Sequence, residues 1–229
     1  MKTSTVAEMA LREIVRRRGV LAILVIFPLA FYLSRRDSHA GQSIRFVCLG
    51  LGWALSTAAL FTGSAARAIE PRLRLSGYRG HHLWLGRLAA LWTVGLALSV
   101  PYFVLIRLDQ DGVRFGAIGL IMLLTVAVAA PFGLALSAAL PRELEGMLVL
   151  LIIVGLQMMM DPAGTASRLL PFWFTREIGT YAVDHTDGGY LERGLVHAVV
   201  CLAALLAVVA VASGWRLRQR SHLRFLAPR

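Results

Sequence analysis

Residues Phe115–Leu140 read FGAIGLIMLLTVAVAAPFGLALSAAL, an unbroken apolar run without a charged side chain. A helix needs about 20 mostly apolar residues to cross a hydrocarbon layer of about 30 Å, and this run is long enough. The segment therefore predicts a transmembrane helix and indicates an integral membrane protein.

Other apolar runs bounded by charged or turn-forming residues lie on both sides of this one. They are Val20–Ser34, Phe46–Ala66, Leu88–Ile106, Met147–Met160 and Leu195–Ser213. The composition agrees, because 57% of the residues are hydrophobic and 16% are charged, against about 45–50% and 25% in soluble domains. We expect an all-α membrane protein with six transmembrane helices in one transmembrane domain, residues 1–229.

Basic residues are distributed very unequally between alternate loops. The N-terminal segment, the loop at 67–87, the turn at Arg142 and the C-terminal tail together carry the whole net charge of +11, and the opposite loops are neutral. The positive-inside rule then places both chain ends in the cytoplasm. We expect the protein to lie in the cytoplasmic (inner) membrane of the cell. Because the basic residues punctuate apolar runs and form no single patch, we expect contact with membrane lipid and not with nucleic acid.

The N-terminal residues 5–18 have the pattern of an amphipathic helix. Apolar side chains between Val6 and Val15 share one half of the helical wheel, and charged side chains occupy the other. We expect this helix to lie in the plane of the membrane interface, with Arg12, Arg16 and Arg17 among its charged residues.

Residues 67–87 form a predicted cytoplasmic loop that is too polar to insert into the membrane. Glu70 and Arg74 are spaced i,i+4, and Gly77 is a suitable helix stop, so we expect a short helix followed by a turn. Residues 161–193 form the longest predicted loop, on the extracytoplasmic side. Its middle, Leu169–Phe174, is strongly apolar and aromatic, which predicts a re-entrant segment that dips back into the membrane.

Motifs of membrane enzymes are not convincing in this sequence. There is no GxxxxGK[ST] phosphate loop, and the adjacent His81 and His82 lack the carboxylates or cysteines of a metal cluster, so we expect no catalytic residue and no metal site. Polar side chains within the spans are few. The clearest are Gln157 and His197, for which hydrogen bonding between helices and a substrate-facing role both stay open.

The order of these elements resembles the permease subunits of type-2 ATP-binding-cassette exporters. The resemblance covers nearly the whole chain by architecture, and its local stretches are Glu70–Tyr78, Leu85–Leu88, Pro141–Gly146 and Leu170–Phe172. In that family an acidic residue, a short helix and a glycine form the coupling helix that docks on the ATPase. Glu70 to Gly77 match this pattern. Family members often have Gly-Thr after the acidic residue, and this chain has Pro71-Arg72 instead.

The resemblance also implies roles for individual residues and segments. Residues 5–18 would touch the ATPase, and Leu169–Tyr181 would close the exit on the outer side. The implied coupling residues are Glu70, Arg72, Arg74, Gly77, Tyr78, Glu143 and Glu145, and the implied residues of the translocation path or exit are Gln157, Phe172, Trp173 and His197.

On this interpretation the chain is a transport subunit and not itself an enzyme. ATP and Mg would be bound by a partner ATPase, no cofactor would be bound by this chain, and a second permease copy or a paralogue would complete the path. The cargo would be amphipathic or lipidic. The alternatives are a membrane enzyme or assembly protein, or an ion-coupled transporter, each working without an ATPase partner.

Overall fold

The computed structural model describes residues 2–36, 40–161 and 164–218, and within these ranges it is helical without any strand. Arg220, Arg224 and Arg229, which contribute to the predicted basic tail, lie outside the described residues. The helices are α1 (Lys2–Arg16), α2 (Arg18–Leu33), α3 (Ala40–Ala66), α4 (Glu70–Leu75), α5 (Gly80–Asp109), α6 (Phe115–Ala139), α7 (Glu143–Met159), the 3-10 helix η1 (Ala166–Leu169), α8 (Phe174–Val183) and α9 (Gly188–Arg218).

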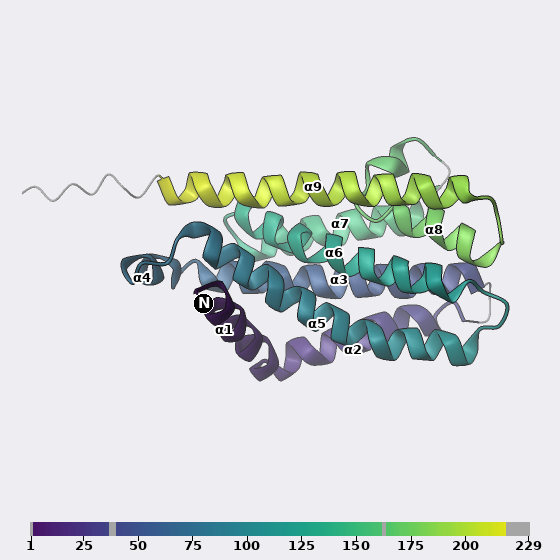
Figure 1. Ribbon diagram of the computed structural model, residues 1–229, viewed down its shortest axis with the longest axis horizontal. Helices are drawn as coiled ribbons and strands as arrows, with labels where there is room; N and C mark the ends of the chain where they lie inside the picture. Colours follow the sequence, from purple (N-terminus) through teal and green to yellow (C-terminus); the bar gives the residue numbers. More distant parts are fainter. Residues whose placement is uncertain (1, 37–39, 162–163, 219–229) are drawn as a thin grey trace, which may run out of the picture.

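The long helices run side by side along one axis of the molecule. Figure 1 shows α1 and α4 at one end of this bundle and α8 at the other, with α9 along one edge. We call the end with α1 and α4 the basic end, and the end with α8 the opposite end.

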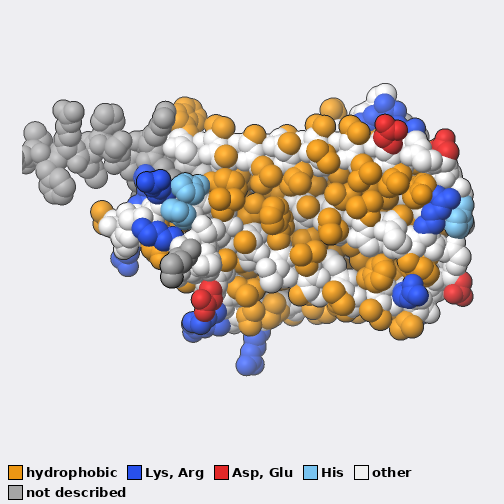
Figure 2. All heavy atoms as spheres, viewed as in Figure 1, with side chains coloured by type: hydrophobic (Ala, Val, Ile, Leu, Met, Phe, Trp, Pro, Cys, Tyr) orange, Lys and Arg blue, Asp and Glu red, His pale blue; other side chains and the backbone are white. Residues whose placement is uncertain are grey.

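Within the described ranges, four helices are long and apolar enough to cross a membrane: α3, α5, α6 and α9. Figure 2 shows hydrophobic side chains covering the middle of the visible face, with charged side chains gathered towards its two ends. The predicted class, a helical membrane protein with several spans, is thereby confirmed. The helices α2 and α7 are shorter, with 16 and 17 residues.

Several helices extend beyond their apolar runs. The predicted loop at 67–87 gives its last residues, from Gly80, to α5, and the predicted loop at 161–193 gives its last residues, from Gly188, to α9. Parts of both predicted loops are therefore helical, because polar residues at the end of a long helix continue its hydrogen bonding although they interrupt its hydropathy.

The N-terminal amphipathic helix packs on protein. It starts at Lys2 and ends at Arg16, two residues before the predicted end, because Arg17 leaves the helical conformation. Its residues Val6, Ala10 and Ile14 are buried, and α1 packs mainly on α5. The apolar face that was expected to lie on the membrane interface therefore serves largely as a contact surface for α5.

The core is built around the contact between α3 and α6. A Cβ added to Gly133 of α6 would lie 2.0 Å from the carbonyl oxygen of Ser56 in α3, so only glycine allows this approach. Pro131 lacks the N–H that would bond to the carbonyl of Ala127, and the indole N–H of Trp92 in α5 donates to that carbonyl at 3.3 Å. The proline in mid-helix thus ties α5 to α6.

The apolar segment around Phe172 enters the opposite end of the bundle. Phe172 is fully buried, and its ring lies against Gly52 of α3 and at 6.0 Å from the ring of Phe132 in α6. Gly52 lies about 18 Å along α3 from its first residue at a rise of about 1.5 Å per residue. The segment therefore inserts between helices instead of lying across their ends.

Candidate functional site

The candidate site is the basic end, where α1, α4 and the start of α5 meet. The connection from α3 into this region is fixed by Arg67. Its guanidinium donates to the carbonyl oxygens of Leu140 at 2.8 Å and Pro141 at 2.7 Å, and also to that of Ser137. Because the last carbonyls of a helix have no partner within it, Arg67 caps the end of α6.

Glu70, the first residue of α4, points into the protein. It is buried and accepts a hydrogen bond of 2.8 Å from Arg87 of α5, and the two side chains are only 9% and 8% exposed. The expected i,i+4 partner was Arg74, and the structure adds Arg87, a residue distant in sequence. The pair of Glu70 and Arg87 thus holds α4 on α5.

Gly77 ends α4 as predicted. Its φ of +80° is the left-handed conformation that favours glycine, and the N–H groups of Gly77 and Tyr78 donate to the carbonyls of Arg74 and Leu73. This is the Schellman arrangement of a helix end. It turns the chain back towards α5 within a few residues.

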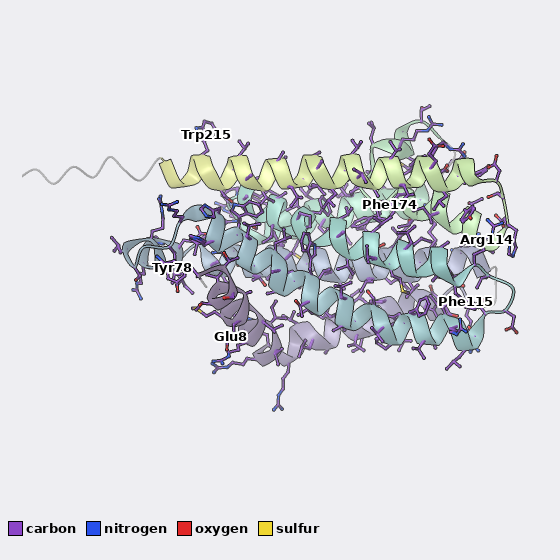
Figure 3. All side chains as sticks on the ribbon, viewed as in Figure 1. Glu8, Tyr78, Arg114, Phe115, Phe174 and Trp215 are labelled. Atoms are coloured by element: carbon purple, nitrogen blue, oxygen red, sulfur yellow. The ribbon has the colours of Figure 1, made fainter. Side chains whose placement is uncertain are left out.

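The start of α1 closes over this turn. Lys2 donates to the carbonyl oxygen of Gly77 at 2.8 Å, and its ammonium lies 5.6 Å from the ring centre of Tyr78. Figure 3 shows Tyr78 next to α4 at the basic end, with Glu8 farther along α1. The close approach of α1 to α5 depends on Gly86, where an added Cβ would lie 2.6 Å from Cβ of Val6.

The exposed side chains on and beside α4 include both charged and apolar residues. Arg72 and Arg74 are exposed, and Leu75 is 91% exposed, beside the half-exposed Ile69. α4 therefore exposes both guanidinium groups and apolar side chains at the basic end.

The other predicted residues of this region lie nearby or on the surface of α1. Glu143 is exposed and Glu145 partly exposed at the start of α7, where Arg142 lies 3.8 Å from Glu145. On α1, Arg12 pairs with Glu8 at 2.5 Å, and Arg17, just after α1, pairs with Glu13 at 2.7 Å. Such exposed pairs contribute little to stability. Arg16 is exposed as well.

The residues predicted for a path or exit lie at the opposite end and form two pairs. The side-chain oxygen of the buried Gln157 accepts from the backbone N–H of Phe172 at 3.3 Å, so these two residues hold the inserted segment in place. Trp173 and His197 form an edge-to-face contact with ring centres 5.2 Å apart, and both line a surface groove. Only the second pair has access to the surface.

Sequence reasoning missed several connecting residues at the opposite end. Glu177 of α8 is 1% exposed and accepts from Arg193 of α9 at 2.9 Å and from Arg176. Arg114 donates to the carbonyls of Tyr181 and Thr186, at 3.3 Å and 3.2 Å. Figure 3 shows Arg114 at this end, next to Phe115. No periodic pattern could have identified these partners, because they are joined only by the fold.

Comparison with known proteins adds no relative: no protein-family model matches the chain, and no curated protein matches it.

Proposed function

We propose that the chain is the membrane-spanning permease subunit of an ATP-binding-cassette exporter, and that a separate subunit hydrolyses ATP. In this proposal α2 and α7 complete a set of six spans, and both chain ends lie in the cytoplasm. Two copies, or one copy and a paralogue, line the path for an amphipathic or lipidic molecule.

The observation that carries the proposal is the way α4 is held. It exposes Arg72, Arg74 and Leu75, while the buried pair of Glu70 and Arg87 fixes it to α5. A docking helix that transmits force needs a rigid connection to a transmembrane helix. At the basic end, Arg67 fixes the segment before α4 to the end of α6, and the pair of Glu70 and Arg87 fixes α4 to α5.

Force applied to α4 has two routes into the bundle. One route leads through Glu70 and Arg87 into α5, and the other leads through Arg67 into the end of α6. Both helices are long enough to cross the membrane. Movement of a bound ATPase would therefore reach the opposite end of the molecule through packed helices, without a flexible linker.

Exposed apolar side chains support a membrane position for the two shorter helices. In α2, Ile23, Val25 and Ile26 are 41–60% exposed, and in α7, Leu148 and Leu151 are 51% and 56% exposed. Such surfaces are suited to lipid or to a second copy and not to water. Short spans are accommodated by thinning of the bilayer or by flanking arginines that reach the interface.

The experiment is purification of the tagged chain from a cell that expresses it with its ATPase, followed by assays of ATP hydrolysis and of ATPase content. We expect the ATPase to co-purify in equal number. Reversing both exposed charges, in Arg72→Glu with Arg74→Glu, should weaken its binding about tenfold or more, because like charges would then face each other across the contact.

A matched control carries the same change of charge at the opposite end, in Arg35→Glu with Arg107→Glu. These arginines are exposed there as well, and each stacks on a phenylalanine ring. The control should keep its ATPase. An equal loss of ATPase binding in both double variants, or full ATPase binding by the α4 variant, would overturn the docking role of α4.

A further inference from the structure

A groove of about 400 Å³ lies on the surface at the opposite end, between η1 and the first turns of α9. Its lining consists of Arg168, Trp173, Glu192, Arg193, Val196, His197 and Val200. The volume is within the range of roughly 300–1,000 Å³ that small-ligand sites occupy. Figure 2 shows basic and acidic side chains together at this end of the molecule, where the hydrophobic belt ends.

The positive charge that the groove offers to a ligand is that of Arg168. Its guanidinium lies 5.7 Å from the ring centre of Trp173, and its backbone carbonyl is bonded to His197 at 2.9 Å, which fixes the local chain. Among the described residues no carboxylate forms an ion pair with Arg168. Arg193, by contrast, is held by the buried Glu177 and stacks on Tyr190.

The groove also offers a negative charge. Glu192 is exposed and takes part in none of the ion pairs found within the described ranges. An anion alone would be attracted by Arg168 and repelled by Glu192. A cation alone would be attracted by Glu192 and repelled by Arg168. A ligand that carries both charges close together satisfies both side chains.

The remaining wall of the groove is apolar and runs along α9 towards the middle of the membrane span. Val196 and Val200 are 58% and 63% exposed, and Val200 lies about 10 Å farther along the helix than Arg193. Trp173, which is largely buried, lines the groove beside Arg168. The groove is therefore charged at the level of the headgroups and apolar at the level of the chains.

We propose that this groove binds one zwitterionic phospholipid. Its phosphate contacts Arg168, and its ammonium contacts Glu192. One acyl chain follows Val196 and Val200 along α9. This proposal is independent of the transport function, because the groove borders lipid in any protein that crosses the membrane with α9.

The test uses the full chain purified in detergent and stripped of phospholipid, with its melting temperature measured before and after addition of a lipid. Phosphatidylethanolamine should raise the melting temperature by about 5 °C, because a ligand bound only by the folded state stabilises it. Phosphatidylglycerol, which has the phosphate without the ammonium, should raise it by about half as much.

Two variants test the contact with the ammonium and the contact with the phosphate separately. In Glu192→Gln the advantage of phosphatidylethanolamine over phosphatidylglycerol should disappear, and in Arg168→Gln the shifts with both lipids should be lost. Arg107→Gln, which removes an exposed arginine outside the groove, should keep the full shifts. Equal shifts for the two lipids in the unmodified chain, or unchanged shifts in both groove variants, would overturn the proposal.

Native mass spectrometry of the unmodified chain gives a second measurement that does not depend on any variant. With an equal mixture of the two lipids, we expect one phosphatidylethanolamine retained on each chain. Equal retention of phosphatidylglycerol would overturn the assignment.

Discussion

The ion pair between Glu70 and Arg87 is the residue contact on which the basic end most depends. Both side chains are largely buried, and each charge is compensated in part by the other. A buried pair of this kind need not be more stable than two apolar side chains, but loss of one partner leaves the other charge buried. The pair therefore fixes where α4 sits on α5.

Single and double substitutions of this pair test its role. Arg87→Met should destabilise the protein by about 3–5 kcal/mol, because the carboxylate of Glu70 loses its buried partner. Glu70→Gln with Arg87→Met should recover most of this loss. Thermal unfolding in detergent, compared for the two variants, measures the difference.

The same comparison has a clear contrary result. If Arg87→Met is as stable as the unmodified chain, the carboxylate of Glu70 is not buried with Arg87 and this pair does not attach α4 to α5. Arg12→Met is a suitable control, because its pair with Glu8 is exposed and should contribute less than about 1 kcal/mol.

At the scale of the elements, the closest helix contact is that of α3 with α6. Small residues allow it: Ser56 and Gly63 on α3 meet Gly133 and Ser137 on α6. Lipid tails are as apolar as the side chains, so the hydrophobic effect does not drive membrane helices together. Close backbone approach of this kind favours their association through van der Waals packing. Pro131 and Trp92 then attach α5 to the same helix.

Substitution of glycine by alanine in two helices should give opposite results. Gly133→Ala should destabilise by about 1–3 kcal/mol, because the new Cβ would overlap the carbonyl of Ser56 and force α3 and α6 apart. Gly155→Ala in α7, where the added Cβ has no neighbour within 4 Å, should be neutral or stabilise by up to about 1 kcal/mol. Melting temperatures in the same detergent compare them directly, and equal effects at the two positions would contradict the described packing.

For the molecule as a whole, the decisive property is orientation in the membrane. The two ends of the bundle differ in charge, because the excess of arginine belongs to the end with α1 and α4. The positive-inside rule assigns that end to the cytoplasm. In the orientation that we propose, the groove proposed for a phospholipid lies in the outer leaflet.

Labelling of single cysteines in whole cells tests this orientation. After replacement of Cys48 and Cys201, an impermeant maleimide should label Asp111→Cys in intact cells. It should label Ser76→Cys and Glu8→Cys only after the membrane is opened. All three positions are exposed, so accessibility depends on the side of the membrane. Labelling of Ser76→Cys in intact cells would indicate the opposite orientation. Labelling of only one of Glu8→Cys and Ser76→Cys in intact cells would contradict an even number of spans between them.

The sequence by itself determined the membrane class, the approximate position of every long helix, the glycine that ends α4 and the unequal distribution of charge. These properties follow from local composition, since a hydrocarbon layer selects for long apolar runs and a left-handed turn selects for glycine. Only the tertiary structure decided that Glu70 faces Arg87, that α1 packs on α5 through Gly86, and that Gln157 holds Phe172. These contacts join residues from different elements, and hydropathy and helical periodicity carry no information about which element lies beside which.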